Sequence, residues 1–215
     1  RMELGRLIRK VFLPREGYVF LDADYSQIEL RLLAHISGDE GLIAAFNSGE
    51  DIHTSTAAEV FGVDKASVTR EQRSAAKAVN FGIVYGISDY GLAKNIGVSR
   101  KEAGEFIRRY LEKYCGVQEY MHRCVEEGRK KGYVTTLMGR RRELPEIKSS
   151  NFNTRSFGER VAMNMPIQGT AADIIKMAMV NVHKRLEEEG LKARLILQIH
   201  DELIIDTPFD EEQRV

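Results

Sequence analysis

Long hydrophobic runs, disulfide-type cysteine patterns and an excess of charge of one sign are all missing from this 215-residue sequence. No apolar run approaches the ~20 residues that a membrane-crossing helix needs, and no signal peptide opens the chain, so we expect no membrane partner. The two cysteines, Cys115 and Cys124, do not have a metal-type spacing. This cysteine usage is typical of a reduced, cytoplasmic protein.

The charges balance, because 32 Lys and Arg oppose 32 Asp and Glu. A neutral chain argues against a nucleic-acid binder that is held by bulk positive charge, although a local basic patch is compatible with neutrality. Hydrophobic residues make up 43% and charged residues 30%, which indicates one large globular domain or two small ones. Because the sequence begins at Arg1 rather than Met and stops at Val215, we interpret it as a piece of a longer protein.

Strand patterns occur at both ends of the sequence. The β-branched and aromatic segment YVFLDAD predicts a strand over 18–24. Near the C-terminus, RLILQI and ELIID predict two strands that are separated only by His200 and Asp201. A further hairpin is predicted over 133–144, with its turn at Met138-Gly139.

Helical patterns fill most of the chain between these strands. Ser26-Gln27-Ile28-Glu29 predicts a capping box that opens a helix, and Ser99 to Glu102 predicts a second one. A later helix is predicted from about Thr154 to Gly190, with an interruption at Pro166. Other helix breaks are predicted at Gly49, Gly62, Gly97 and Gly116. The order of elements predicts an α+β fold with a large helical subdomain inserted into a small antiparallel sheet.

Two acidic residues lie at the tips of predicted strands. Asp24 ends the first strand, and Asp201 lies in the turn of the last hairpin, where His-Asp is a poor choice for turn geometry alone. A polar turn is the simpler interpretation. If the strands are neighbours, however, the two carboxylates lie close together and suit Mg²⁺, which takes one or two protein carboxylates. Asp22 shares the face of Asp24, so spacing alone does not choose between them.

The segment RSAAKAVNFGIVYG carries polar and aromatic residues at every fourth position: Arg73, Lys77, Phe81 and Tyr85. On a helix these side chains follow one face over roughly 18 Å, at ~1.5 Å per residue. One interpretation is an amphipathic helix with solvated cations and aromatic rings in the core. The other is a binding face for a nucleoside triphosphate, with cations on the phosphates and rings on the sugar and base.

Three segments together resemble a known family. DYSQIELR (24–31), Arg73 to Gly86 with its RxxxKxxxFGxxYG pattern, and HDE (200–202) resemble motifs A, B and C of family A DNA polymerases, in the same order. The resemblance extends through the chain, including DIHTSTAAEVFG, GRRRELP and PIQGTAADIIK. It implies a palm formed by 1–35 and 161–215 and a fingers subdomain over 36–160. The family's thumb has no counterpart in the sequence.

The resemblance implies roles for individual residues. Asp24 and Asp201 would hold two Mg²⁺ ions, or Mn²⁺ in their place, together with the backbone carbonyl of Tyr25, and Lys77 would assist catalysis. The residues implied to contact the incoming deoxynucleoside triphosphate are Glu29, His53, Arg73, Lys77, Phe81 and Tyr85. Those implied to contact primer–template DNA are Arg160, Asn164, Gln168, His200 and Glu202. Glu29 would exclude the ribose 2′-hydroxyl, although it also fits the predicted capping box.

The resulting expectation is a monomeric, bacterial, nucleoid-associated enzyme that adds deoxynucleotides to a primer. Three alternatives remain open. A single-subunit RNA polymerase shares the carboxylates and the lysine, a two-metal nuclease or phosphatase shares the carboxylates alone, and a piece without a thumb would bind nucleotides or DNA without turnover.

Overall fold

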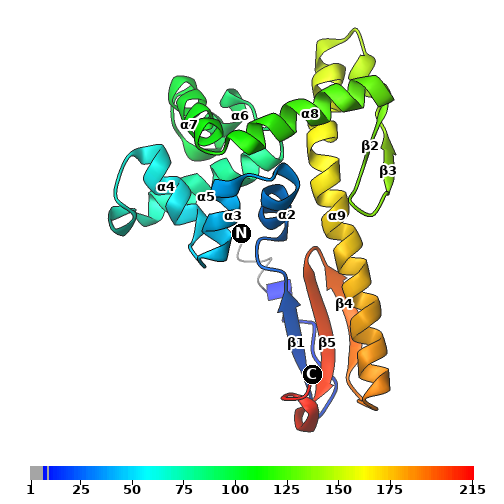
Figure 1. The fold of residues 1–215 in the computed structure, drawn as a ribbon. Coiled ribbons are helices and arrows are strands. Elements are labelled where there is room, and N and C mark those ends of the chain that lie inside the picture. Colours follow the sequence, from blue (N-terminus) through cyan, green and yellow to red (C-terminus); the bar gives the residue numbers. More distant parts are fainter. Residues whose placement is uncertain (1–6, 9) are drawn as a thin grey trace. The chain divides into compact units, whose positions relative to one another are not determined.

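The computed structural model describes residues 7, 8 and 10–215 and divides the chain into two compact units. The sheet unit is discontinuous and combines Arg1–Ser26 with Ala172–Val215, whereas the helical unit is the continuous segment Gln27–Ala171 (Figure 1). The α+β class with a helical insertion is therefore confirmed. The predicted palm and fingers boundaries stay a prediction, and residues 1–6 and 9 of the first palm segment lie outside the described residues.

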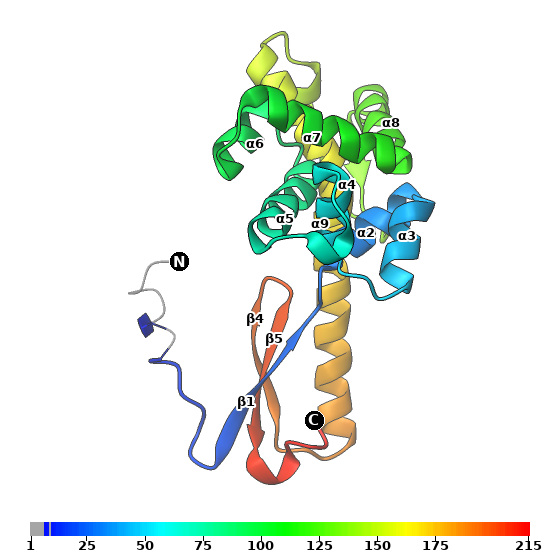
Figure 2. The same ribbon diagram turned by 90° about the vertical axis from the view of Figure 1, so that its left-hand side faces the viewer.

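The sheet unit contains the three strands expected from the ends of the sequence. They are β1 (Tyr18–Asp24), β4 (Arg194–Ile199) and β5 (Glu202–Pro208), in the spatial order β1-β5-β4 with antiparallel neighbours. The first and the last segments of the chain thus pair directly, as Figure 2 shows. The edge strand β4 carries exposed apolar side chains at Ile196, Leu197 and Ile199.

One long helix, α9 (Phe152–Glu188), begins in the helical unit and ends in the sheet unit. Its C-terminal part packs against the sheet through a small core in which Leu186, Ala193 and Ile205 are buried. The predicted interruption at Pro166 is wrong, because α9 continues through this residue. Proline removes one backbone hydrogen bond, but the neighbouring Ile167 and the residue one turn earlier, Ala162, are almost fully buried, and this packing holds the helix together.

Apart from the first part of α9, the helical unit consists of helices (Figure 2) followed by a hairpin (Figure 1). Its α-helices are α2 (Ile28–Ser37), α3 (Glu40–Asn47), α4 (Ile52–Phe61), α5 (Arg70–Val84), α6 (Asp89–Ile96), α7 (Arg100–Lys113) and α8 (Cys115–Lys131). Short 3₁₀ turns occur at η1 (Lys65–Ser67) and η2 (Pro145–Lys148), and a third, η3 (Phe209–Glu211), follows β5 in the sheet unit. The predicted hairpin is confirmed as β2 (Tyr133–Thr135) and β3 (Arg141–Glu143).

Most α-helices begin at a side chain that caps the first turn, but α2 and α8 begin without such a hydrogen bond. The capping box at Ser99 and Glu102 is confirmed, and Thr69 forms an unexpected one with Gln72 at the start of α5. The capping box predicted at Ser26 is wrong, because α2 begins at Ile28 after Gln27, whose φ of 56° is left-handed and which makes no side-chain cap hydrogen bond. The break predicted at Gly116 falls instead at Tyr114.

The β2–β3 hairpin is attached to α9 by buried contacts and by one polar bridge. Val134, Leu144 and Ile147 form a core with Ala162 of α9. In addition, the Thr170 hydroxyl accepts a hydrogen bond from the backbone N–H of Leu137 at 3.1 Å. These contacts place the hairpin against the part of α9 that belongs to the helical unit.

Two further observations concern the chain as a whole. Both cysteines are free, with Cys115 exposed and Cys124 buried. Among residues 7, 8 and 10–215, no helix is long and apolar enough to cross a lipid bilayer.

Two helical glycines differ in the space around them, which allows a matched test of the packing of α9. A Cβ at Gly158 would lie 2.7 Å from the backbone nitrogen of Ile147, whereas a Cβ at Gly104 in α7 would meet only Asp89 Cβ at 3.9 Å. We expect Gly158→Ala to destabilise the chain by about 1–3 kcal/mol through overpacking, and Gly104→Ala to stabilise it by up to ~1 kcal/mol through helix propensity. Thermal unfolding followed by circular dichroism measures both, and equal effects would contradict the packing described for α9.

Candidate active site

The two acidic strand tips meet in the sheet unit. Asp24 is the last residue of β1 and is paired in register with Glu202, the first residue of β5. The backbone N–H of Tyr25 donates a hydrogen bond to the carbonyl of Asp201 at 3.2 Å, which ties the end of β1 to the turn. The antiparallel pairing of β1 with β5 therefore brings the predicted metal residues Asp24, Tyr25 and Asp201 together.

Asp22, Asp24 and Asp201 form an acidic corner of the sheet unit, in which a negative charge on Asp24 is disfavoured. Partial burial and the neighbouring charges of Asp201 and Asp22 raise the pKa of Asp24 above its usual value. The contribution of Asp201 is consistent with the backbone pairing that brings it near Asp24, and that of Asp22 with its place on the same face of β1. A bound cation would relieve this repulsion.

The donor set fits a hard divalent cation. Within the described part of the chain, no group of three or more His, Cys, Asp or Glu side chains could hold a metal ion, so a zinc-type cage is not formed there. Two exposed or half-exposed carboxylates at strand ends instead suit Mg²⁺, which fills the rest of its shell with water and substrate oxygens. The residues present therefore fit the ion that the sequence implied.

The turn between β4 and β5 is strained at its first residue. His200 has a φ of 56°, and the only other non-glycine residue with positive φ among the described residues is Gln27. The Gln198 side-chain amide donates to the carbonyl of His200. Such backbone strain persists only where the surroundings hold it, and it concentrates at functional sites. Here it lies directly beside Asp201.

Arg73 and Lys77, the two cations of the predicted row, lie on α5 in the helical unit and are exposed. We call these two residues the cationic stripe. The helix ends at Val84, so that Tyr85 occupies the C-cap and Gly86, with a φ of 64°, turns the chain away. Lys77 Nζ lies 5.9 Å from the centre of the half-buried Phe81 ring. The opposite face buries Ala76, Val79 and Ile83. The core is thus on the other side of α5, although the last residue of the predicted row, Tyr85, lies one residue beyond the end of the helix.

His53 and Arg73 lie near each other through Asp51, a residue that the sequence analysis did not select. Arg73 forms an ion pair with Asp51, whose Oδ1 accepts the backbone N–H of His53 at 3.1 Å. Burial opposes charge on Asp51, but hydrogen bonds from Arg73, Thr54 and the His53 N–H outweigh it and lower the pKa of Asp51 to about 2. The helix-start pattern predicts Asp51 as the cap of α4, but no sequence signal predicts its ion pair with a residue 22 positions away.

Glu29 and Tyr85 are brought together across the helical unit. The Tyr85 hydroxyl donates a hydrogen bond to Glu29 Oε2 at 2.8 Å. Tyr85 and Phe81 also line a hollow of ≈ 500 Å³ together with Arg160 of α9. Gly86 lies beneath Arg160, because a Cβ there would come within 2.9 Å of Arg160 Cγ. Residues implied for nucleotide and for DNA contacts therefore share one hollow.

The predicted DNA-contacting residues lie in two groups. Arg160, Asn164 and Gln168 follow one another along the part of α9 that belongs to the helical unit, and all three are half-buried. The Asn164 Oδ1 atom is buried without a hydrogen-bond partner among the described residues. His200 and Glu202 flank Asp201 in the sheet unit, and His200 is exposed. That the acidic pair faces the stripe of α5 stays a prediction.

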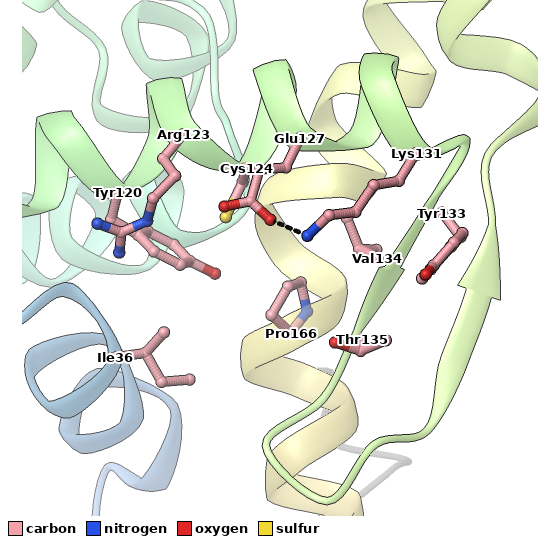
Figure 3. A pocket seen from close by; sticks show the side chains of 10 residues that line it. All are labelled: Ile36, Tyr120, Arg123, Cys124, Glu127, Lys131, Tyr133, Val134, Thr135 and Pro166. Carbon is pink, nitrogen blue, oxygen red and sulfur yellow. Dashed lines mark hydrogen bonds and ion pairs between the residues drawn. The ribbon is translucent and has the colours of Figure 1, made fainter.

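A second hollow, of ≈ 170 Å³, lies elsewhere in the helical unit (Figure 3). Its lining side chains come mainly from α8 and β2: Ile36, Tyr120, Arg123, Cys124, Glu127, Lys131, Tyr133, Val134, Thr135 and Pro166. Figure 3 shows the ion pair between Glu127 and Lys131 along its rim. None of the site residues implied by the motifs lines it, so it is separate from the candidate site.

The acidic corner makes a pH-dependent prediction. Because the folded chain raises the pKa of Asp24, ionising Asp24 costs stability, and this cost appears as the pH rises through the folded pKa. We expect Asp201→Asn to raise the unfolding midpoint at about pH 7 and to leave it unchanged at about pH 3, where Asp24 is protonated. The exposed Asp210 of the same unit provides the control Asp210→Asn. Equal shifts for the two variants at both pH values would contradict the proximity of Asp24 and Asp201.

The comparisons with known proteins agree with the motifs. The family described as DNA polymerase family A matches residues 1–215. DNA polymerase I of Bacillus subtilis is 62% identical over 212 residues, covering 98% of this chain and 24% of that protein. DNA polymerase I of Caldicellulosiruptor bescii is 61% identical over 211 residues, covering 98% of this chain and 25% of that protein. The chain thus spans about a quarter of the length of these relatives.

A solved structure gives the same result for the fold. The polymerase domain of Pol1 from M. smegmatis, in complex with DNA primer-template and dNTP, matches 100% of this chain and 38% of its own, with a TM-score of 0.94 and 47% sequence identity. Because the family match spans residues 1–215, the chain belongs to DNA polymerase family A.

Proposed function

We propose that the chain carries the nucleotidyl-transfer site of a template-directed DNA polymerase. The site would add a deoxynucleotide to a primer 3′-hydroxyl and release pyrophosphate. The convergence of Asp24 and Asp201 at the paired ends of β1 and β5 carries the proposal. Support also comes from the family membership, from relatives that are named DNA polymerase I and from the M. smegmatis domain with its bound primer-template and dNTP.

The acidic corner would hold Mg²⁺. Asp24 and Asp201 would supply carboxylate oxygens and Tyr25 its backbone carbonyl, and Mn²⁺ is a substitute with similar ligands. When bound, a pair of such ions would supply Lewis-acid chemistry to the attacking hydroxyl and to the leaving phosphate oxygens. The carboxylates would keep these ions at a fixed place, because the β1–β5 pairing and the Tyr25–Asp201 hydrogen bond hold both strand tips.

The exposed cations of α5 would bind the triphosphate. Arg73 offers a planar guanidinium that can pair with two phosphate oxygens, and its Nε is already oriented by Asp51. Lys77 would add a point charge, stabilise the charge that develops on the leaving group and donate a proton to pyrophosphate. His53 would contribute a third contact from the first turn of α4.

The hollow beside α5 would receive the sugar and the bases. Phe81 would pack on the deoxyribose, and Tyr85 would lie at the template-base position with Glu29 held by its hydroxyl. Glu29 would then exclude a ribose 2′-hydroxyl. We also propose that Arg160, Asn164, Gln168, His200 and Glu202 contact primer–template DNA near the primer end.

The remaining expectations belong to the same proposal. We propose that 1–35 and 161–215 correspond to a palm and 36–160 to fingers, and that the protein is a monomeric cytoplasmic enzyme of bacterial DNA replication and repair.

Primer extension tests the proposal directly. With a primer-template, the four dNTPs and Mg²⁺, we expect the chain to extend the primer, and Asp201→Ala to lower the rate by at least about a hundredfold, because removing a ligand displaces the metal. Asp210→Ala is the matched control, since it removes an exposed acid of the same unit away from the corner. A gel shift run alongside should show unchanged DNA binding by Asp201→Ala.

The outcomes separate the proposal from its alternatives. A wild-type chain that binds DNA without extending the primer contradicts the proposed activity and supports a binding piece without turnover. Cleavage of DNA without synthesis supports the nuclease alternative.

Sugar discrimination tests the Glu29–Tyr85 pair. We expect Glu29→Ala to raise the ratio of ribonucleotide to deoxynucleotide incorporation by about tenfold or more, because a carboxylate no longer fills the space near the 2′ position. Tyr85→Phe removes only the hydroxyl that binds Glu29, so it should cause a smaller rise. Single-nucleotide incorporation on a gel measures both ratios, and a preference for ribonucleotides in the wild-type chain would instead support an RNA polymerase.

A further inference from the structure

Three buried polar side chains, which form a hydrogen-bonded network, link α4 to α5, the helix that carries the cationic stripe. The side-chain amide of Asn80 lies 3.0 Å from His53 Nδ1, and the Thr56 hydroxyl donates to Asn80 Oδ1 at 3.0 Å. Asn80 is fully buried, while Thr56 is 1% and His53 3% exposed. Polar groups buried this deeply are normally hydrogen-bonded. The question is therefore which atom donates and which accepts at each step of the network.

The direction follows from which atom of the Asn80 amide faces each neighbour. The oxygen Oδ1 lies 3.0 Å from the Thr56 hydroxyl, and the nitrogen Nδ2 lies 3.0 Å from His53 Nδ1. Because the amide nitrogen only donates, His53 Nδ1 must accept this hydrogen bond, so it carries no proton.

The charged neighbours of His53 favour the neutral ring. Burial lowers the pKa of His53, the Asp51 carboxylate opposes this shift, and the Arg73 and Lys77 charges on α5 lower the pKa further. A neutral imidazole carries one proton, and its place is set by the hydrogen bond of the other nitrogen. With Nδ1 accepting from Asn80, the proton is on Nε2.

The Nε2 atom of the 3% exposed His53 ring differs from Nδ1 in its hydrogen bonding. His53 has no hydrogen-bond partner at Nε2 among the described residues, and its ring centre lies 5.9 Å from that of Phe81. A protonated Nε2 donates to an anionic oxygen, whereas the other tautomer would present a lone pair and repel it.

We propose that Asn80 is a positioning residue that fixes His53 as the Nε2–H tautomer, so that His53 donates a hydrogen bond to the triphosphate of the incoming nucleotide. Thr56 orients Asn80, and Asn80 in turn orients His53. Asn80 touches no ligand itself and acts only through the imidazole. The triphosphate as ligand rests on the proposed function, whereas the tautomer is a property of the chain alone.

Ring-nitrogen chemical shifts test the tautomer without any nucleotide. In long-range ¹H–¹⁵N correlation spectra of the 215-residue chain, we expect the His53 nitrogens to report an unprotonated Nδ1 and a protonated Nε2. Asn80→Asp replaces the donor with an acceptor, so it should place a proton on Nδ1. Thr56→Val should give a mixture of tautomers, because Asn80 can then turn over.

Thr170→Val is the matched control for these spectra. Thr170 is also a fully buried threonine with a hydrogen-bonded hydroxyl, but it bridges α9 and the β2–β3 hairpin instead. We expect its substitution to leave the His53 shifts unchanged. A protonated Nδ1 in the wild-type chain, or wild-type shifts in both Asn80→Asp and Thr56→Val, would overturn the proposal.

Binding of dATP in the presence of Mg²⁺ tests the consequence. We expect Asn80→Leu to weaken binding by about tenfold, the effect of one lost charge-assisted hydrogen bond. His53→Ala should weaken it similarly, and the double variant should be no weaker than His53→Ala, because Asn80 acts through His53. Additive losses would show that Asn80 acts independently and would overturn the positioning role.

The two proposals fail in different ways. A wild-type chain that does not bind dATP contradicts the proposed function and the ligand of His53 together. The ring-nitrogen shifts decide the tautomer in either case.

Discussion

The antiparallel pairing of β1 with β5 is the constraint on which the candidate site depends. It is formed by segments from opposite ends of the sequence, and it alone brings Asp24 beside Asp201. The raised pKa of Asp24 is the electrostatic cost of this arrangement. A cation bound between the two carboxylates would remove this cost.

In the helical unit, exposed charges are likewise placed by specific partners. Arg73 and Lys77 are exposed, and an ion pair with Asp51 orients Arg73. The negative charge of Asp51 is in turn stabilised by three hydrogen bonds. On α4 and α5, the side chains of His53, Asn80 and Thr56 are buried and hydrogen-bonded to one another. Side chains that are already ordered lose less conformational entropy when a ligand binds, which lowers the cost of binding.

Local patterns in the sequence predicted most elements but missed contacts between distant residues. The strands over 18–24 and 194–199 were predicted to the residue, whereas β5 continues to Pro208, two residues beyond the predicted segment ELIID. The capping box at Ser26 failed because Gln27 adopts a left-handed conformation, and the break at Pro166 failed because tertiary packing holds α9 together. The family motifs indicated His53 and Glu29. The partners of these residues, Asn80 and Tyr85, are set by helix packing, which no local rule describes.

The discontinuity of the sheet unit has a consequence for the order in which the chain folds. Arg15 and Asp206, which form an ion pair near the end of β1 opposite to Asp24, are 191 positions apart. During synthesis on the ribosome, β1 emerges long before its partner strand exists, whereas Gln27–Ala171 is continuous and can collapse as soon as it is complete. Closing so long a loop over an unfolded segment would be slow, and a helical unit that is already compact shortens the effective loop. We therefore expect the pairing of β1 with β5, which brings Asp24 beside Asp201, to form after the helical unit.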